Sequence, residues 1–308
     1  MAGTVLLSSS AEARASHLLT VADWVRAIAS DMARADVGLG QGVQSYVDDA
    51  RWLVLGALRL APDAPDTLDD ARLLPAEQQL LFEVASRRIQ GREPTAYVLG
   101  EAWLRGHRFK SDPRAIIPRS LISELLWPPS LPLQGGDPTH VLDLCTGGGS
   151  LAILAALAWP DCRVQAVDLS PDALALAREN VALHGKAQQI ELHEGSLFEP
   201  LQKGAMFDLI LCNPPYVPTR KVDHAPLEFQ KEPRMALEAG DDGMRVLRGL
   251  LSGYQNWLTP DGSLVVEVGQ EYEATMSLFE NEFPQLEPLW LETTQTHDHV
   301  FLLQGGCT

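Results

Sequence analysis

The feature that most constrains the fold is an alternation of strand and helix patterns from residue 139 onward. Short apolar runs predict strands at Val141–Leu144, Val164–Val167, Ile190–His193, Leu209–Cys212 and Leu264–Val268. Helical patterns separate these runs at Leu151–Ala158, Pro171–His184, Gly243–Leu258 and Tyr272–Phe283. This alternation is typical of a mostly parallel α/β sheet covered by helices. Two last runs, Leu289–Glu292 and Val300–Leu303, predict an antiparallel hairpin.

The part of the chain before residue 119 has a different pattern. Apolar stripes at helical spacing, separated by prolines, predict a small all-helical domain over residues 1–95. Residues 96–118 predict a β-hairpin linker, and residues 119–308 form the predicted α/β domain. A chain of 308 residues is long enough for both.

Composition narrows the possible partners and the compartment. Lys and Arg number 24 against 41 Asp and Glu, so the net charge is −17. Stable nucleic-acid binding through a broad basic surface is therefore not expected, whereas an acidic surface suits a basic protein partner. The chain has no apolar run of membrane-spanning length, no recognisable leader and no paired cysteine motif, so we expect a cytoplasmic protein without a membrane partner. No metal site is expected, because His297 and His299 lack a third cluster of ligands.

The segment Asn213-Pro214-Pro215-Tyr216 directly follows the apolar run that ends at Cys212. Each proline fixes its own φ and holds the preceding residue extended. The Asn213 side-chain oxygen and the Pro214 carbonyl then form two fixed acceptors at the carboxyl end of a strand, where open α/β sheets bind ligands. Such a pair suits a planar NH2 group, although a purely structural Pro-Pro turn is the alternative.

A second motif, Asp143-Leu144-Cys145-Thr146-Gly147-Gly148-Gly149, follows the first predicted strand. Its glycines permit a tight turn and a close approach to a ligand, and they also satisfy the spacing of a dinucleotide-binding turn. Asp143 would disfavour a pyrophosphate but suits the cationic groups of S-adenosylmethionine. Asp168, which ends the second strand, can accept from the ribose of either cofactor. Hydride transfer does not need the Asn-Pro-Pro-Tyr segment, so the two motifs together favour a methyltransferase.

With these motifs the chain resembles the class I, Rossmann-like S-adenosylmethionine-dependent methyltransferases. More narrowly, it is similar over nearly its full length to the HemK/PrmB family of protein N(5)-glutamine methyltransferases. The resemblance implies a mostly parallel seven-stranded sheet, with the helical domain recognising the substrate. The segment Pro118-Arg119-Ser120-Leu121 resembles the branch that modifies the large-subunit ribosomal protein L-three. The implied reaction is methylation of the side-chain amide nitrogen of a glutamine in that basic protein.

The resemblance also implies roles for individual residues. Asp143, Gly147 and Gly149 would surround the methionine part of the cofactor, and Asp168 its ribose. The full set of expected cofactor contacts is Asp143, Cys145, Thr146, Gly147, Gly149, Asp168, Leu169, Ser196, Leu197 and Asn213. Asn213, Pro214, Pro215 and Tyr216 would be catalytic, and Asn213, Pro214, Tyr216 and Arg119 would bind the substrate. Family members often carry an Asp where this chain has Ser196, so we expect backbone or packing by Leu197 to hold the adenine.

Three alternatives remain open at this point. The target could be the glutamine of peptide-chain release factors, although that branch usually follows Pro-Arg with Pro-Asp/Glu-Thr-Glu. It could also be an exocyclic adenine or guanine amine of a nucleic acid, which would need a basic channel. The third alternative is a cofactor-binding module without catalysis.

Overall fold

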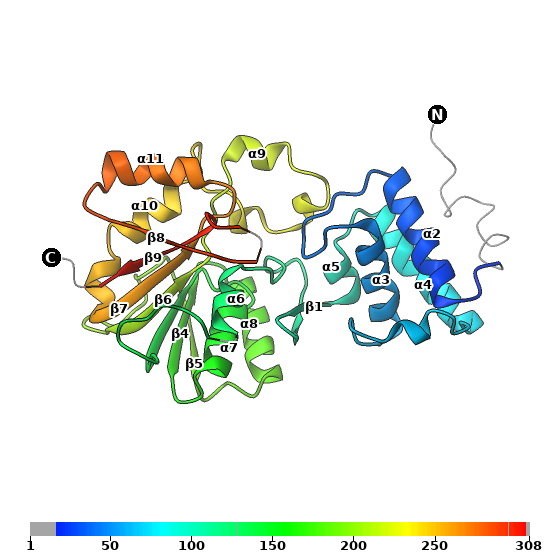
Figure 1. Cartoon of the computed structure of the whole chain (residues 1–308), viewed down its shortest axis with the longest axis horizontal. Helices are drawn as coiled ribbons and strands as arrows, with labels where there is room; N and C mark the ends of the chain where they lie inside the picture. Colours follow the sequence, from blue (N-terminus) through cyan, green and yellow to red (C-terminus); the bar gives the residue numbers. More distant parts are fainter. Residues whose placement is uncertain (1–16, 128, 295, 306–308) are drawn as a thin grey trace. The chain divides into compact units, whose positions relative to one another are not determined.

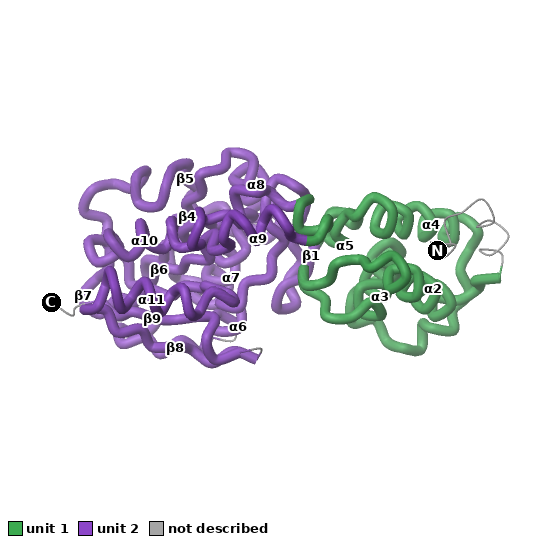
Figure 2. Tube along the Cα trace, turned by 90° about the horizontal axis from the view of Figure 1, so that it is seen from above, with its two compact units in different colours: residues 1–101, 226–231 green, residues 102–225, 232–308 purple. Residues whose placement is uncertain are grey.

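The computed structural model describes residues 17–127, 129–294 and 296–305, and it divides the chain into two compact units. Unit 1 comprises the described residues within Met1–Glu101 together with the short segment Pro226–Lys231, and unit 2 comprises those within Ala102–Ala225 and Glu232–Thr308 (Figure 2). The segment Pro226–Lys231 lies far outside the helical region expected from the sequence. The chain therefore passes from unit 2 into unit 1 and back after the Asn-Pro-Pro-Tyr segment.

Unit 1 is built from helices, as the apolar stripes predicted (Figure 1). Its helices are α2 (Val21–Arg34), α3 (Tyr46–Ala57), the 3-10 turn η1 (Asp66–Leu68), α4 (Pro75–Ile89) and α5 (Thr95–Leu99). Thr20 caps α2: its side chain accepts from the Asp23 amide, and the Asp23 carboxylate accepts from the Thr20 amide. The apolar faces meet in a core that includes Trp24, Met32 and Leu53.

The predicted linker contains a hairpin that is shorter than expected. Strands β1 (Glu101–Leu104) and β2 (His107–Lys110) form a two-stranded sheet. Arg105 and Gly106 both have positive φ, +51° and +79°, as the two central residues of a type I′ turn require. The beginning of the predicted hairpin is helix α5 instead, which ends at Gly100 in the left-handed conformation.

Unit 2 contains the predicted mostly parallel seven-stranded sheet, with strand order β5-β4-β3-β6-β7-β9-β8. Its strands are β3 (His140–Leu144), β4 (Arg163–Asp168), β5 (Ile190–Glu194), β6 (Phe207–Cys212), β7 (Leu258–Glu267), β8 (Leu289–Leu291) and β9 (Val300–Gln304). Strands β3 to β7 pair in parallel, whereas β9 pairs antiparallel with both β7 and β8. The chain moves outward from β3 to β5 and then returns to β6 on the other side of β3. The loops after β3 and β6 therefore meet at a topological switch point, which is where such sheets bind ligands.

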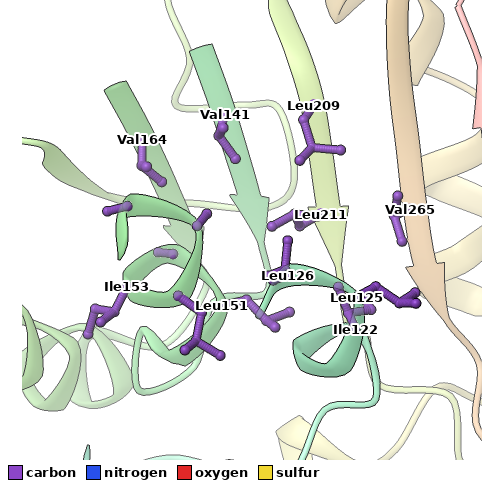
Figure 3. Close-up of a cluster of buried hydrophobic side chains, with 14 of the residues drawn as sticks. Ile122, Leu125, Leu126, Val141, Leu151, Ile153, Val164, Leu209, Leu211 and Val265 are labelled. Carbon is purple, nitrogen blue, oxygen red and sulfur yellow. The ribbon is translucent and has the colours of Figure 1, made fainter. Parts of the chain in front are cut away.

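Helices cover both faces of this sheet (Figure 1). Helices α6 (Ile122–Leu126), α7 (Ser150–Ala158) and α8 (Pro171–Leu183) lie on one face, and α10 (Arg245–Leu251) and α11 (Tyr272–Glu282) lie on the other. On the first face, Leu125 and Leu151 pack beneath strand residues such as Val141, Leu209 and Val265 (Figure 3). The alternate strand residues form the second cluster, so the parallel strands are buried on both sides, as continuous apolar runs predict.

Two predicted boundaries were wrong. The expected helix Gly243–Leu258 stops at Leu251, Gly253 interrupts it, and the 3-10 turn η4 (Tyr254–Trp257) follows. Strand β7 then begins at Leu258, because a bulge lets that residue pair with Phe207. The loop after β6 contains α9 (Thr219–Asp223), η2 (Phe229–Lys231) and η3 (Arg234–Ala236), which the sequence pattern did not indicate. In the described ranges, every helix is too short or too polar to cross a membrane.

Candidate functional site

The glycine-rich turn after β3 depends on left-handed backbone. Cys145, Gly147 and Gly149 have φ values of +58°, +56° and +82°. A Cβ on Gly149 would lie 3.3 Å from the Cβ of Ala177 in α8, so a side chain there would be both strained and crowded. The Thr146 amide donates to the carbonyl of Val167, which fixes the turn to β4. The turn thus leads into α7 with its backbone open to the close approach of a ligand.

Asp143 lies beneath this turn and is fully buried. One carboxylate oxygen, Oδ2, accepts from the Thr146 hydroxyl at 2.5 Å and from the Ala152 amide at 3.0 Å. The other, Oδ1, has no hydrogen-bond partner among the described residues. Burial raises the pKa of Asp143 to about 7, and the two hydrogen bonds to Oδ2 oppose that rise. Asp143 therefore organises the turn with one oxygen and leaves the other for a donor from outside the protein.

Asp168, at the end of β4, connects the turn to the second strand. Its Oδ2 accepts from the Gly147 amide at 2.8 Å, and its Oδ1 accepts from the Ser170 amide at 2.8 Å. Burial raises its pKa, while these backbone bonds oppose the rise. Leu169 follows with 56% of its surface exposed, which is unusual for a leucine at the end of a buried strand. An exposed apolar side chain beside a carboxylate is suited to a flat, partly polar ligand such as a nucleoside.

The segment after β5 lies next to Asp168. The Gly195 amide donates to the Asp168 carbonyl, so Ser196 and Leu197 start from the same sheet edge. Leu197 has a positive φ of +47°, and a Cβ on Gly249 would lie 3.2 Å from its Cδ1. Phe198 stacks on Trp257 with 5.5 Å between ring centroids. Packing therefore holds this segment, while Ser196 is half-buried.

The Asn-Pro-Pro-Tyr loop follows β6, and Cys212 pairs with Leu144 of β3. Asn213 is half-buried and Pro214 is buried. The last residues of the loop are closely enclosed by two glycines. A Cβ on Gly243 would lie 2.4 Å from the Tyr216 carbonyl oxygen, and a Cβ on Gly269 would lie 2.7 Å from the Tyr216 ring. Because these distances are shorter than any real Cβ contact, both positions require glycine, and the loop is held from the β7 side as well as by its prolines.

Tyr216 itself lies in a charged environment. Burial raises the pKa of its hydroxyl, and the negative charge of Glu267 raises it further, while Arg119 lowers it. Glu267 ends β7, where its Oε2 accepts from the Ser120 hydroxyl at 2.5 Å and the Leu121 amide at 2.8 Å. Glu267 therefore connects the segment around Arg119 to the strand that flanks the loop.

Arg119 forms an ion pair of 2.7 Å with Glu232, whose side chain is buried. The same Glu232 oxygen accepts from the Ile117 amide at 3.1 Å. The resemblance implies that Arg119 binds the substrate, whereas this pairing supports a role in anchoring its own segment. The organising role of Glu232 was missed, because the pairing of two distant segments leaves no local signal in the sequence. Glu267 ends a predicted strand, where the sequence allows either a catalytic carboxylate or a hydrogen-bonding role at the sheet edge, and its contacts with Ser120 and Leu121 support hydrogen bonding.

The structure thus gathers most of the expected cofactor residues at one sheet edge. The loops after β3, β4, β5 and β6 all end there, because their strands are neighbours in the sheet. The arrangement fits S-adenosylmethionine. Asp143 Oδ1, which has no partner among the described residues, can accept a hydrogen bond from a ligand. The glycine turn leaves room for a ligand to approach the backbone closely. The exposed Leu169 side chain provides an apolar contact, and the Asp168 carboxylate provides hydrogen-bond acceptors.

A glycine turn and a proline-stiffened Asn-Pro-Pro-Tyr loop on neighbouring strands define the class of protein: unit 2 is an S-adenosylmethionine-dependent methyltransferase domain. In agreement, residues 125–248 match the family model described as Methyltransferase small domain. A solved methyltransferase from Pyrococcus furiosus is similar over 64% of this chain and 88% of that chain, at 17% identity and a TM-score of 0.46. The narrower assignment rests on closer relatives.

Those relatives share the description ribosomal protein uL3 glutamine methyltransferase. The protein from Bordetella pertussis is 45% identical over 290 residues, which cover 93% of this chain and 95% of that protein. The protein from Burkholderia pseudomallei is 42% identical with the same coverage, and that from Francisella tularensis is 37% identical over 93% of this chain and 90% of that protein. The chain belongs to the family of ribosomal protein uL3 glutamine methyltransferases.

Proposed function

We propose that this protein methylates the side-chain amide nitrogen of a glutamine in ribosomal protein uL3, the L-three protein of the large subunit, in the cytoplasm. The single observation that carries this proposal is the register of β3 and β6, in which Leu144 pairs with Cys212. That pairing brings the Asn-Pro-Pro-Tyr loop, which in this proposal is the amide-accepting loop (residues 213–216), beside the glycine turn. A group held by Asn213 and a cofactor held by the turn therefore lie next to each other.

The chain's own residues hold and orient both reactants. Asp143, Gly147, Gly149 and Asp168 would hold S-adenosylmethionine, which would supply an electrophilic methyl group on its sulfonium. The Asn213 side-chain oxygen and the Pro214 carbonyl accept from the two hydrogens of the glutamine amide. These acceptors bind the nitrogen more strongly as it gains positive charge, which is the differential binding that catalysis requires. Orienting two reactants in this way can remove about 7–11 kcal/mol from a barrier.

Substitution of Asn213 by Ala tests this assignment. We expect Asn213→Ala to abolish methyl transfer to intact uL3, because one of the two amide acceptors is lost. The affinity for S-adenosylmethionine, measured by calorimetry, should stay close to that of the wild type. Asn256→Ala is the matched control, because Asn256 is an exposed asparagine on η4. Normal turnover by Asn213→Ala would show that the loop does not hold the target amide.

The target itself is identified with labelled S-adenosylmethionine and a cell extract, with and without nuclease. Label on one basic ribosomal protein, located by mass spectrometry at a glutamine of uL3, supports the proposal. Label on a release factor supports the first alternative, and nuclease-sensitive label supports nucleic-acid methylation. A protein that binds the cofactor but transfers no label would be a binding module. The net charge of −17 favours the first outcome, because an acidic protein attracts a basic protein and repels a nucleic acid.

We also propose that unit 1 selects the protein substrate. Its described helices surround a separate apolar core. The expected contacts of the cofactor and the amide all lie in unit 2, so unit 1 is not needed to hold either of them. A separate compact unit of this kind provides surface for recognising residues around the target glutamine.

A further inference from the structure

The loop that follows the Asn-Pro-Pro-Tyr segment is closed at its base. We call residues 218–237 the tether loop. The Val217 amide donates to the Leu237 carbonyl at 2.9 Å, and the Ala239 amide donates to the Val217 carbonyl at 3.0 Å. The Thr219 hydroxyl donates to the Glu238 carboxylate at 2.7 Å. Because this base begins one residue after Tyr216, the position of the tether loop and that of the amide-accepting loop are linked.

The middle of the tether loop belongs to unit 1. Residues Pro226–Lys231 cluster with unit 1, and they are drawn in its colour in Figure 2. Within that segment the Glu228 side chain is 1% exposed and accepts from Arg92 Nη1 at 3.0 Å. The Glu228 carbonyl accepts from the Gln41 side chain at 3.3 Å. A Cβ on Gly38 would lie 2.6 Å from the Glu228 carboxylate. A side chain at position 38 would therefore clash with Glu228, and glycine leaves the room that the carboxylate occupies.

Glu228 enters a buried charge network of unit 1. Arg88 Nη1 lies 3.7 Å from Glu228 and its Nη2 lies 2.7 Å from Asp49, and the Arg88 and Asp49 side chains are almost fully buried. Arg92 also donates to the carbonyls of Ala35 and Asp36. Buried charges require such pairing, because an unpaired one is strongly destabilising. The network fixes the segment Pro226–Lys231 far more specifically than apolar packing alone would.

The tether loop is then fastened again in unit 2. Glu232 is the first residue after the segment of unit 1, and it is the buried partner of Arg119 and of the Ile117 amide. The loop is therefore held by one buried carboxylate in each unit, four residues apart, and closed at its base beside Tyr216. Only three residues separate Glu228 from Glu232, so we expect a displacement of Glu228 to be transmitted to the base of the tether loop.

We propose that Glu228 is a positioning residue that couples unit 1 to the amide-accepting loop. An intact protein substrate that docks on unit 1 thereby acts on the amide-accepting loop through the tether loop, whereas a short peptide that does not dock there gains nothing from the coupling. The inference rests on the proposed function, because it concerns the same reaction and the same substrate.

The test compares two substrates of three variants. The substrates are intact uL3 and a short peptide that spans its methylated glutamine. Glu228→Ala should lower kcat/KM for intact uL3 by about tenfold or more, as expected for a lost coupling between sites, and leave the peptide unchanged. Glu228→Gln keeps the shape and one acceptor, so it should lose less. It also provides a folded variant if Glu228→Ala does not fold.

Asp49→Asn is the matched control. It disturbs the same buried network through Arg88, but the Asp49 carboxylate accepts hydrogen bonds from Arg88 and Thr95, which lie outside the tether loop. Its ratio of kcat/KM for the intact protein to that for the peptide should equal the wild-type ratio. If Asp49→Asn lowers the ratio as much as Glu228→Ala does, the effect reflects only the stability of unit 1 and the inference is overturned.

Hydrogen exchange gives a readout that does not depend on activity. The Val217 and Ala239 amides at the base of the loop should exchange faster in Glu228→Ala and at the wild-type rate in Asp49→Asn. Unchanged exchange together with an unchanged substrate ratio would refute the coupling. A wild-type protein that fails to methylate uL3 refutes the proposed function instead, so the two failures are distinguishable.

Discussion

At the scale of single residues, the two carboxylate oxygens of Asp143 differ: one is hydrogen-bonded within the protein, and the other is buried without a partner among the described residues. The bonded oxygen, Oδ2, organises the turn through Thr146 and Ala152. Burial raises the pKa of this carboxyl to about 7. The ligand-free protein therefore keeps a group beneath its glycine turn that changes charge near neutral pH.

This shift predicts how stability depends on pH. Because the folded-state pKa of about 7 lies above the ordinary 3.8, the folded protein binds this proton more tightly than the unfolded chain. The stabilisation is complete below pH 3.8 and is lost as pH rises through 7. Asp143→Asn cannot titrate, so between about pH 5 and pH 8 the wild type should lose up to about 2–3 kcal/mol more unfolding free energy than the variant. Denaturant unfolding of the ligand-free proteins at both pH values measures this difference, and parallel pH profiles would contradict it.

At the scale of structural elements, the Asn-Pro-Pro-Tyr loop depends on contacts that other segments make with it. Gly243 precedes α10, and Gly269 lies between β7 and α11. Both glycines adopt positive φ, and both leave room that Tyr216 occupies. The prolines stiffen the loop from within, and these two glycines allow the neighbouring segments to enclose it.

Substitution of Gly269 by Ala tests this enclosure. We expect Gly269→Ala to lower turnover on the glutamine substrate, because its Cβ would lie 2.7 Å from the Tyr216 ring. The affinity for S-adenosylmethionine, measured by calorimetry, should change little.

Gly185→Ala is the control for backbone strain. Gly185 has a similar φ of +66°, but a Cβ there meets nothing within 4 Å. Both variants carry the cost of a left-handed non-glycine residue, about 1–2 kcal/mol, so both should melt earlier than the wild type. Equal turnover in the two variants would show that the Tyr216 contact does not matter.

Sequence alone predicted those elements whose local pattern determines them. The apolar runs gave the strands, and the two prolines and the glycines gave the stiff loop and the tight turn, because those residues restrict or free their own backbone. The predicted helix Gly243–Leu258 was too long, because Gly253 interrupts the helix after Leu251 and the residues that follow form a 3-10 turn, while only Leu258 joins β7 by pairing with Phe207. The partners of Asp143, Glu232 and Glu267 could not be predicted, since they depend on which distant segments the fold brings together.

At the scale of the whole molecule, the net charge of −17 should act on the encounter with a basic substrate. Attraction between oppositely charged proteins raises the association rate and is screened by salt. Between about 0.05 and 0.5 M salt we expect KM for intact uL3 to rise several-fold while kcat stays nearly constant. Steady-state kinetics across a salt series measures this, and the short peptide is the control. A KM that does not respond to salt would mean that charge does not guide the substrate.

The pairing of Leu144 with Cys212 has one more consequence. Adjacent strands are about 4.8 Å apart, and the ladder between β3 and β6 keeps that spacing whatever side chains the loops carry. With the two reactants held as proposed, the separation between methyl donor and acceptor would be set by the main-chain spacing of β3 and β6. Changes of target can accumulate in peripheral segments without disturbing the geometry on which the chemistry depends.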